Sequence, residues 1–175
     1  MVAHLCGMLA LAAAGVLVGR LGDVLPSRGA AVARNLALPG AVLTALFFGV
    51  ETFGLAAVAG SLPEPEAMAV AEAIRNHPTA LGVLALGLVG LAVVALLAAA
   101  AWQRAGIDRG WALCPLAVLV ALVLPQFFLP VVGRMAFGVL WGVAAALFAW
   151  ALVAAGLPGR AGAPTRGKVT PEAVL

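Results

Sequence analysis

The chain has 175 residues, of which 65% are hydrophobic and only 10% are charged, with a formal net charge of +3. A soluble domain is usually about 45–50% apolar and about 25% charged, so a water-soluble fold of this size could not bury so much apolar surface. The composition excludes a soluble globular protein and predicts an all-α, polytopic membrane protein in a lipid bilayer. Nucleic acid is not expected as a partner, because the sequence shows no basic patch with an aromatic platform.

The first apolar run covers residues 2–19 and ends at Arg20. It predicts a retained first membrane helix. The alternative is a cleaved signal peptide, which would leave four helices, but no basic residue precedes the run and no small-residue cleavage site follows it. Residues 20–35 carry charges together with Pro26 and Gly29, which favour turns, so they are expected to form a short loop.

The second run, residues 36–62, holds a single charge, Glu51, within 27 residues. A transmembrane helix needs about 20 apolar residues, so this run is long enough to cross a bilayer. A carboxylate inside a membrane is energetically costly, and such residues commonly mark functional sites. Glu51 is therefore the first candidate site residue.

Residues 61–78 are the most polar part of the body of the chain. Pro63 and Pro65 open this segment and Pro78 ends it, and the charged residues between them can share one short helix. Its apolar face is too small to form a core. The segment is therefore expected to be a short extracytoplasmic amphipathic helix that lies flat on the membrane surface.

Three further runs are expected to cross the membrane: residues 79–101, which carry no charge, 112–133, which contain three prolines, and 135–158. The link 102–111 is basic and has a tryptophan at each end, as is typical of the membrane interface. The remaining residues, 159–175, are rich in glycine, proline and basic side chains and are predicted to be a disordered cytoplasmic tail.

The runs divide the chain into a bundle of five spanning helices, residues 1–158, and the tail. Basic residues concentrate on the cytoplasmic side of membrane proteins. With the N-terminus outside, only Arg75 and Arg134 fall on the outer side. The eight basic residues on the inner side are Arg20, Arg28, Arg34, Arg104, Arg109, Arg160, Arg166 and Lys168. An outside N-terminus and a cytoplasmic C-terminus are therefore predicted.

This topology brings Glu51, Gln126 and Arg134 toward the outer half of the membrane, and His4 and His77 also fall on the outer side. Thr44, seven residues before Glu51, shares a face of its helix, and Glu51, Gln126, Arg134 and Thr44 form the candidate intramembrane cluster. Counted from Leu36 at about 1.5 Å per residue, Glu51 lies about 22 Å into a hydrocarbon core about 30 Å thick. Arg134 is the nearest cation for Glu51. Pro125 cannot donate a backbone hydrogen bond, so it leaves a carbonyl free beside Gln126.

The candidate intramembrane cluster has two interpretations. It is either a polar clamp that fixes helix packing, or a site for a proton, cation or solute that opens to the outside. The clamp is favoured, because Glu51 has no second intramembrane acid with which to form a relay.

The sequence gives little support for catalysis or for binding of a metal or cofactor. The chain has no HExxH, GxSxG, Walker or dinucleotide-binding motif, so it is not expected to be an enzyme, and a membrane-bound enzyme stays only as a minor alternative. Cys6 and Cys114 form no CxxC pair, and no metal site is expected. His4 and His77 leave a haem or metal protein open as a minor alternative, because imidazole is a common ligand, but nothing in their spacing asks for a cofactor.

Small residues recur at a spacing of four in two of the expected helices, as Gly15 with Gly19 and Gly138 with Gly142. This spacing lets helices approach closely. It is compatible with packing inside one bundle and with formation of a homo-oligomer or hetero-oligomer.

The Ala-, Val- and Leu-rich body resembles the small multi-pass membrane proteins of high-GC actinobacteria. The resemblance rests on ETFGLAAVAG at residues 51–60, on RNHP at 75–78 and on WQRAG at 102–106. It implies a bacterial plasma membrane location and carries no activity. We therefore expect a non-enzymatic membrane component or accessory subunit, with a small transporter or permeation subunit that uses Glu51 as the alternative.

Overall fold

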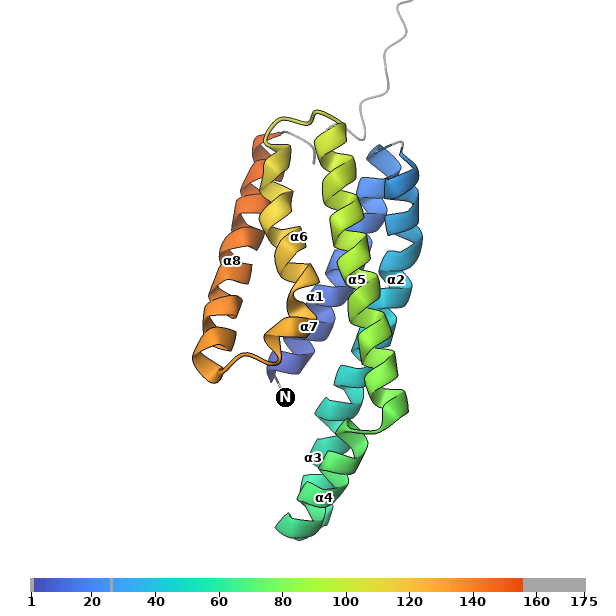
Figure 1. Cartoon of the computed structure of the whole chain (residues 1–175), viewed down its shortest axis with the longest axis vertical. Helices are drawn as coiled ribbons and strands as arrows, with labels where there is room; N and C mark the ends of the chain where they lie inside the picture. The colour runs from blue at the N-terminus through green and yellow to red at the C-terminus, as the bar shows by residue number, and fades with distance from the viewer. Residues whose placement is uncertain (1, 26, 156–175) are drawn as a thin grey trace, which may run out of the picture.

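A computed structural model describes residues 2–25 and 27–155, and every regular element in these ranges is helical (Figure 1). The α-helices are α1 (Val2–Val24), α2 (Arg28–Gly49), α3 (Leu55–Ser61), α4 (Glu64–Arg75), α5 (Pro78–Arg104), α6 (Leu113–Ala121), α7 (Val123–Gln126) and α8 (Val131–Ala154). A π-helix, η1 (Val50–Gly54), joins α2 to α3, and a 3₁₀-helix, η2 (Gly110–Ala112), precedes α6. The tail expected over residues 159–175 lies outside the described residues.

The long helices run alongside one another in alternating directions, as Figure 1 shows. α2 and α5 share the most extensive contact, α1 packs on α2, α6 packs on α5, and α8 packs on α6. α1 begins at the lower end of the view in Figure 1, and α8 ends at the upper end. α3 and α4 pack together as an antiparallel hairpin that extends past the lower end of the bundle.

Helix caps shorten the loop between the first two helices. The side-chain oxygen of Ser27 accepts a hydrogen bond from the N–H of Ala30 at 3.1 Å, which caps the start of α2. α1 continues to Val24 and α2 begins at Arg28, so the four charged residues of the loop expected over 20–35 all lie on helices. The expectation was wrong because a single capping residue allows helix to resume directly after the turn.

The second apolar run forms the longest helical stretch in the described part of the chain. α2, η1 and α3 continue one another over Arg28–Ser61, a stretch of 34 residues. Helix continues through η1, where the N–H of Leu55 donates to the carbonyl of Val50, five residues back. At about 1.5 Å per residue this stretch is about 51 Å long, whereas a bilayer's hydrocarbon core is about 30 Å thick. A membrane around the bundle would leave part of it outside.

Glycines allow α2 and α5 to approach closely near the middle of the bundle. A Cβ atom added at Gly87 would lie 2.5 Å from Oγ1 and 2.8 Å from the backbone N of Thr44. Thr44 is fully buried, and its hydroxyl donates to the carbonyl of Gly40 at 2.9 Å. Its polar group is thus satisfied within its own helix, which is how an isolated hydroxyl can be buried at low cost.

The upper end of the bundle is closed by aromatic side chains. Trp102, at the end of α5, is only 2% exposed and meets Phe148 of α8 edge to face, with ring centroids 5.9 Å apart. The guanidinium carbon of Arg109 lies 4.8 Å from the ring centroid of Trp150, a cation–π contact. A Cβ atom added at Gly110 would lie 2.8 Å from Cδ1 of Trp102, so the turn before α6 is pressed against this ring.

Three helical stretches are long and apolar enough to cross a membrane: Arg28–Ser61, Pro78–Arg104 and Val131–Ala154. Of the other two expected spans, 2–19 lies within α1, which is apolar over Leu5–Leu21, and 112–133 corresponds in part to the shorter apolar helix Gly110–Ala121. The expected span 112–133 is interrupted, because α6 ends at Ala121. Pro125 explains the break, since it has no N–H to donate to the Ala121 carbonyl.

Candidate functional site

An ion pair joins the base of the α3–α4 hairpin. Nε of Arg75, at the end of α4, donates to Oε1 of Glu51, in η1, at 2.7 Å. The side chain of Glu51 is 16% exposed and that of Arg75 is 52% exposed. The two residues are 24 positions apart in sequence, and the reversal of the chain at Pro63 brings them together. The pair therefore closes the hairpin onto the end of α2.

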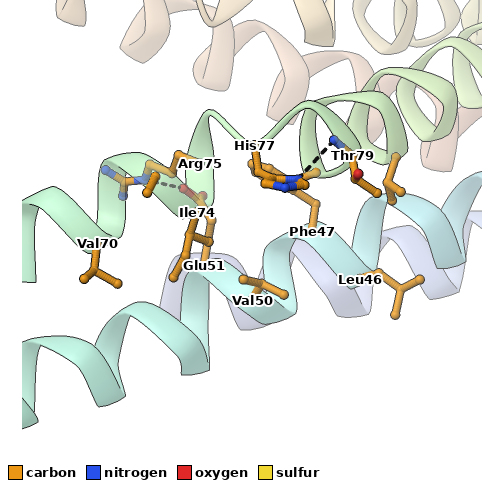
Figure 2. Close-up of a pocket in the computed structure, with 12 residues that line it drawn as sticks. Leu46, Phe47, Val50, Glu51, Val70, Ile74, Arg75, His77 and Thr79 are labelled. Carbon is orange, nitrogen blue, oxygen red and sulfur yellow. Dashed lines mark hydrogen bonds and ion pairs between the residues drawn. The ribbon is translucent and has the colours of Figure 1, made fainter.

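A groove of about 710 Å³ opens beside this ion pair (Figure 2). Three stretches of chain form its walls: the end of α2 with η1, the second half of α4, and the start of α5 with its cap. The lining residues are Leu46, Phe47, Val50, Glu51, Val70, Ala73, Ile74, Arg75, His77, Thr79, Ala80 and Val83. The groove is mostly apolar, and it carries one acid, one guanidinium and one imidazole.

His77 positions the start of α5. Its Nδ1 accepts a hydrogen bond from the backbone N–H of Thr79 at 3.3 Å, and Pro78 occupies the first turn, where no N–H is needed. A neutral imidazole that accepts at Nδ1 carries its proton on Nε2, so His77 retains one N–H donor. In Figure 2, Arg75, His77 and Thr79 lie along one wall of the groove, opposite Leu46 and Val50.

The antiparallel register of α2 and α5 fixes the level of the groove in the bundle. Thr44 lies against Gly87. Glu51 follows seven residues later, in η1, and Ala80 lies seven residues earlier on α5; both line the groove. The groove therefore lies about 10 Å, or two helical turns, below the close contact of the two helices.

The four candidate residues of the sequence-based cluster fall at different places. Glu51 lines the groove, whereas Thr44 is buried in the α2–α5 contact. Gln126 ends α7 and is half-buried, and Arg134 is exposed in the first turn of α8. The cation that contacts Glu51 in the structure is Arg75, in place of the expected Arg134. The physical reason is that η1 packs with α2 and α3, whereas α8 packs with α6, α7 and η2.

The sequence contained a signal for the correct partner. Pro63 lies midway between residues 51 and 75, so a helical hairpin that turns there places these two positions opposite one another. The amphipathic helix expected over residues 61–78 does form, as α4. It packs along α3, and this packing places Arg75 beside Glu51.

Two further properties bear on chemistry at this end. Thr52, next to Glu51, is 2% exposed, and its hydroxyl has no hydrogen-bond partner among the described residues. π-helical turns such as η1 are frequent at functional sites. Among the side chains that the structure describes, those of residues 5–21, 25 and 27–155, no three of His, Cys, Asp or Glu are grouped so that they could hold a metal ion.

Comparison of the chain with protein-family models, with curated proteins and with solved structures finds no match. The class of the protein therefore follows from its own fold. It is an all-helical chain, with no strand among its described residues, and it has three helical stretches that are long and apolar enough to cross a membrane.

Proposed function

We propose that the protein is a non-enzymatic component of the bacterial plasma membrane, an accessory subunit that crosses the bilayer five times and presents the α3–α4 hairpin outside. The five crossings are α1, α2, α5, α6 with α7, and α8. The N-terminus lies outside and the C-terminus in the cytoplasm. The hairpin is the element with which this subunit recognises its partner protein.

The proposal rests on one observation, the α3–α4 hairpin that the Glu51–Arg75 ion pair holds against the end of the bundle. The stretch Arg28–Ser61 is longer than a hydrocarbon core is thick, so α3 extends into the aqueous phase. α4 packs on α3, and the Glu51–Arg75 ion pair holds its end at 2.7 Å. α4 nevertheless buries none of its own residues, and Met68 is 57% exposed. A helix that is held in place but left uncovered is available to a partner.

The distribution of charge supports the proposed orientation. Arg28, Arg104 and Arg109 lie at or near helix ends at the upper end of the bundle. The lower end holds Arg75 in the hairpin and Arg134 at the start of α8. Because basic residues concentrate on the cytoplasmic side, the upper end is assigned to the cytoplasm and the hairpin to the outside.

The interior of the bundle favours this role over solute permeation. A cavity of about 90 Å³ between α1, α2, α5, α6 and α8 is lined only by alanine, glycine, valine, leucine and phenylalanine residues. A pathway for ions or protons needs polar groups along its length. Glu51 lies instead beside the hairpin and is engaged by Arg75.

Orientation can be tested by cysteine labelling in intact cells. Cys6 and Cys114 are first replaced by serine, and single cysteines are placed at Ala67 in α4 or at Gln103 at the upper end. A membrane-impermeant maleimide should label Ala67→Cys in intact cells, and it should label Gln103→Cys only after permeabilisation. Labelling of Gln103→Cys in intact cells with protection of Ala67→Cys would reverse the proposed orientation.

The accessory role can be tested by photo-crosslinking in the native membrane. A photoreactive side chain at Met68, on the hairpin, should form a discrete adduct with a second protein. The control position is Val139, which is 68% exposed on α8 and should yield lipid adducts alone. Absence of a protein adduct at Met68, in cells that make both variants equally well, would refute recognition through the hairpin.

A further inference from the structure

The groove beside the ion pair exposes apolar side chains that the described chain leaves uncovered. Leu46 is 57% exposed and Val50 is 48% exposed, and both lie on one wall. The volume, about 710 Å³, falls in the range of about 300–1,000 Å³ that is typical of small-molecule sites. An apolar chain laid in this groove would cover surface contributed by three different helical stretches.

The opposite wall carries hydrogen-bond donors. Arg75 uses its Nε for Glu51, and the rest of its half-exposed guanidinium has no partner among the described residues. Four N–H groups on its two Nη atoms therefore remain available. The Nε2 of neutral His77 supplies a further donor on the same wall. Guanidinium groups bind phosphate oxygens in pairs, which makes a phosphate the best-matched polar group.

The position of the groove relative to the proposed membrane indicates which amphiphilic molecule it binds, namely a membrane lipid. From Arg28 to Glu51 the helix rises about 35 Å, at about 1.5 Å per residue. A hydrocarbon core about 30 Å thick that begins near Arg28 therefore ends within about one helical turn of Glu51. At this level lipid acyl chains meet their phosphate headgroups, so the apolar and the donor walls of the groove match the two parts of one lipid.

We propose that this groove binds an anionic phospholipid of the outer leaflet, with one acyl chain along the end of α2 and the start of α5 and its phosphate on Arg75. The inference rests on the membrane placement proposed above. Glu51 has two effects on this site: it positions the guanidinium, and its negative charge weakens the attraction of Arg75 for the phosphate. The expected preference for an anionic lipid is therefore modest.

The test uses the full chain in nanodiscs of phosphatidylglycerol and phosphatidylcholine in equal amounts. After transfer to a mild detergent, native mass spectrometry counts the lipids that each chain retains. We expect one retained phosphatidylglycerol, preferred over phosphatidylcholine by about three- to tenfold. Arg75→Gln should abolish the preference. Arg75→Lys should keep part of it, because the charge remains but the paired N–H groups are lost.

Glu51→Gln separates a phosphate site from a purely structural ion pair. If Arg75 holds a phosphate, removal of the neighbouring negative charge should strengthen retention of phosphatidylglycerol, opposite to the effect of Arg75→Gln. If the pair only maintains the hairpin, both substitutions should weaken retention alike. Val83→Phe fills the groove and should reduce retention of both lipids.

Two substitutions serve as controls. Leu81→Phe adds the same ring on α5 at a position that does not line the groove and is 46% exposed. Arg134→Gln removes an exposed arginine at the same end of the bundle. Both should leave lipid retention unchanged.

The proposal is overturned if Arg75→Gln retains phosphatidylglycerol as the unchanged protein does, or if Val83→Phe has no effect. Lipid-free dimers that Val83→Phe disrupts would assign the groove to a second copy of this chain. Failure of the chain to enter nanodiscs at all would instead refute the proposed membrane placement. A chain that enters them in the proposed orientation but retains no lipid would refute only this inference.

Discussion

The two ends of the bundle are built from different side chains. At the upper end, Trp102 is buried against Phe148, and Arg109 covers the ring of Trp150. At the lower end, aliphatic residues of three helical stretches line an open groove, and an ion pair between partly exposed side chains closes the hairpin. Large rings fill the space between helices at one end, whereas at the other end the space stays open.

This difference predicts that the upper end of the bundle contributes mainly to stability and the lower end mainly to binding. A buried indole is among the largest single contributors to the stability of a packed core. A partly exposed ion pair contributes little, because solvent screens it and two long side chains must be ordered. We therefore expect substitutions at the upper end to unfold the protein and substitutions at the lower end to change what it binds.

The largest effect is expected from Trp102→Ala. Loss of this buried ring should lower the free energy of unfolding by about 3–5 kcal/mol, because it leaves a cavity against Phe148 and Gly110. The measurement is equilibrium unfolding by a denaturing detergent, followed by circular dichroism.

The matched control is Trp111→Ala, since Trp111 is 54% exposed. Its loss should cost less than about 1 kcal/mol. Equal effects of the two substitutions would mean that the aromatic contact at the upper end does not hold the bundle together.

An intermediate effect is expected at the contact between α2 and α5 in the middle of the bundle. Gly87→Ala places a Cβ 2.5 Å from Oγ1 of Thr44, so α2 and α5 must separate. Overpacking of this kind typically costs about 1–3 kcal/mol.

Gly82→Ala, on the same helix, is the control, because a Cβ at Gly82 meets nothing within 4 Å. This change should be neutral or stabilise the helix by up to about 1 kcal/mol, since alanine has the higher helix propensity. Unfolding curves that shift equally for the two variants would contradict the close approach of α2 and α5.

The smallest effect is expected from the ion pair. Glu51→Gln and Arg75→Gln should each lower the free energy of unfolding by about 1 kcal/mol or less, because Arg75 is half-exposed. The double variant should lose little more than either single one, since the residues share one interaction.

Arg134→Gln provides the comparison that separates the structure from the sequence-based prediction. It should leave the unfolding curve unchanged and should be additive with Glu51→Gln. Strong coupling of Glu51 to Arg134, with none to Arg75, would restore the pairing that the sequence suggested.

The all-helical fold could be predicted, because the composition and the lengths of the apolar runs can be read directly from the sequence. The uncharged run 79–101 lies within α5, and the run 36–62 lies within the continuous stretch Arg28–Ser61. Pro125 was expected to leave a backbone carbonyl free, and α6 indeed ends at Ala121, the residue to whose carbonyl a non-proline residue at 125 would donate.

The partner of Glu51 was not predictable in the same way, because it depends on the direction in which one helix leaves another. Only the estimated depth in the membrane suggested Arg134 as the partner of Glu51. Two residues at the same depth can lie on different sides of a helix bundle. The turn at Pro63 decides the partner by returning α4 along α3. The groove was missed for the same reason, since its walls come from α2 with η1, α4 and α5 and exist only once the hairpin is folded.

The continuous stretch Arg28–Ser61 has a mechanical consequence. In the proposed membrane placement, the continuous helix through η1 connects the hairpin rigidly to the membrane-spanning part of the bundle. A helix longer than the local hydrocarbon thickness tilts to bury its apolar length. Thinning of the bilayer would therefore swing the hairpin sideways, and thickening would draw it upright, so the position of α4 would follow the thickness of the surrounding membrane.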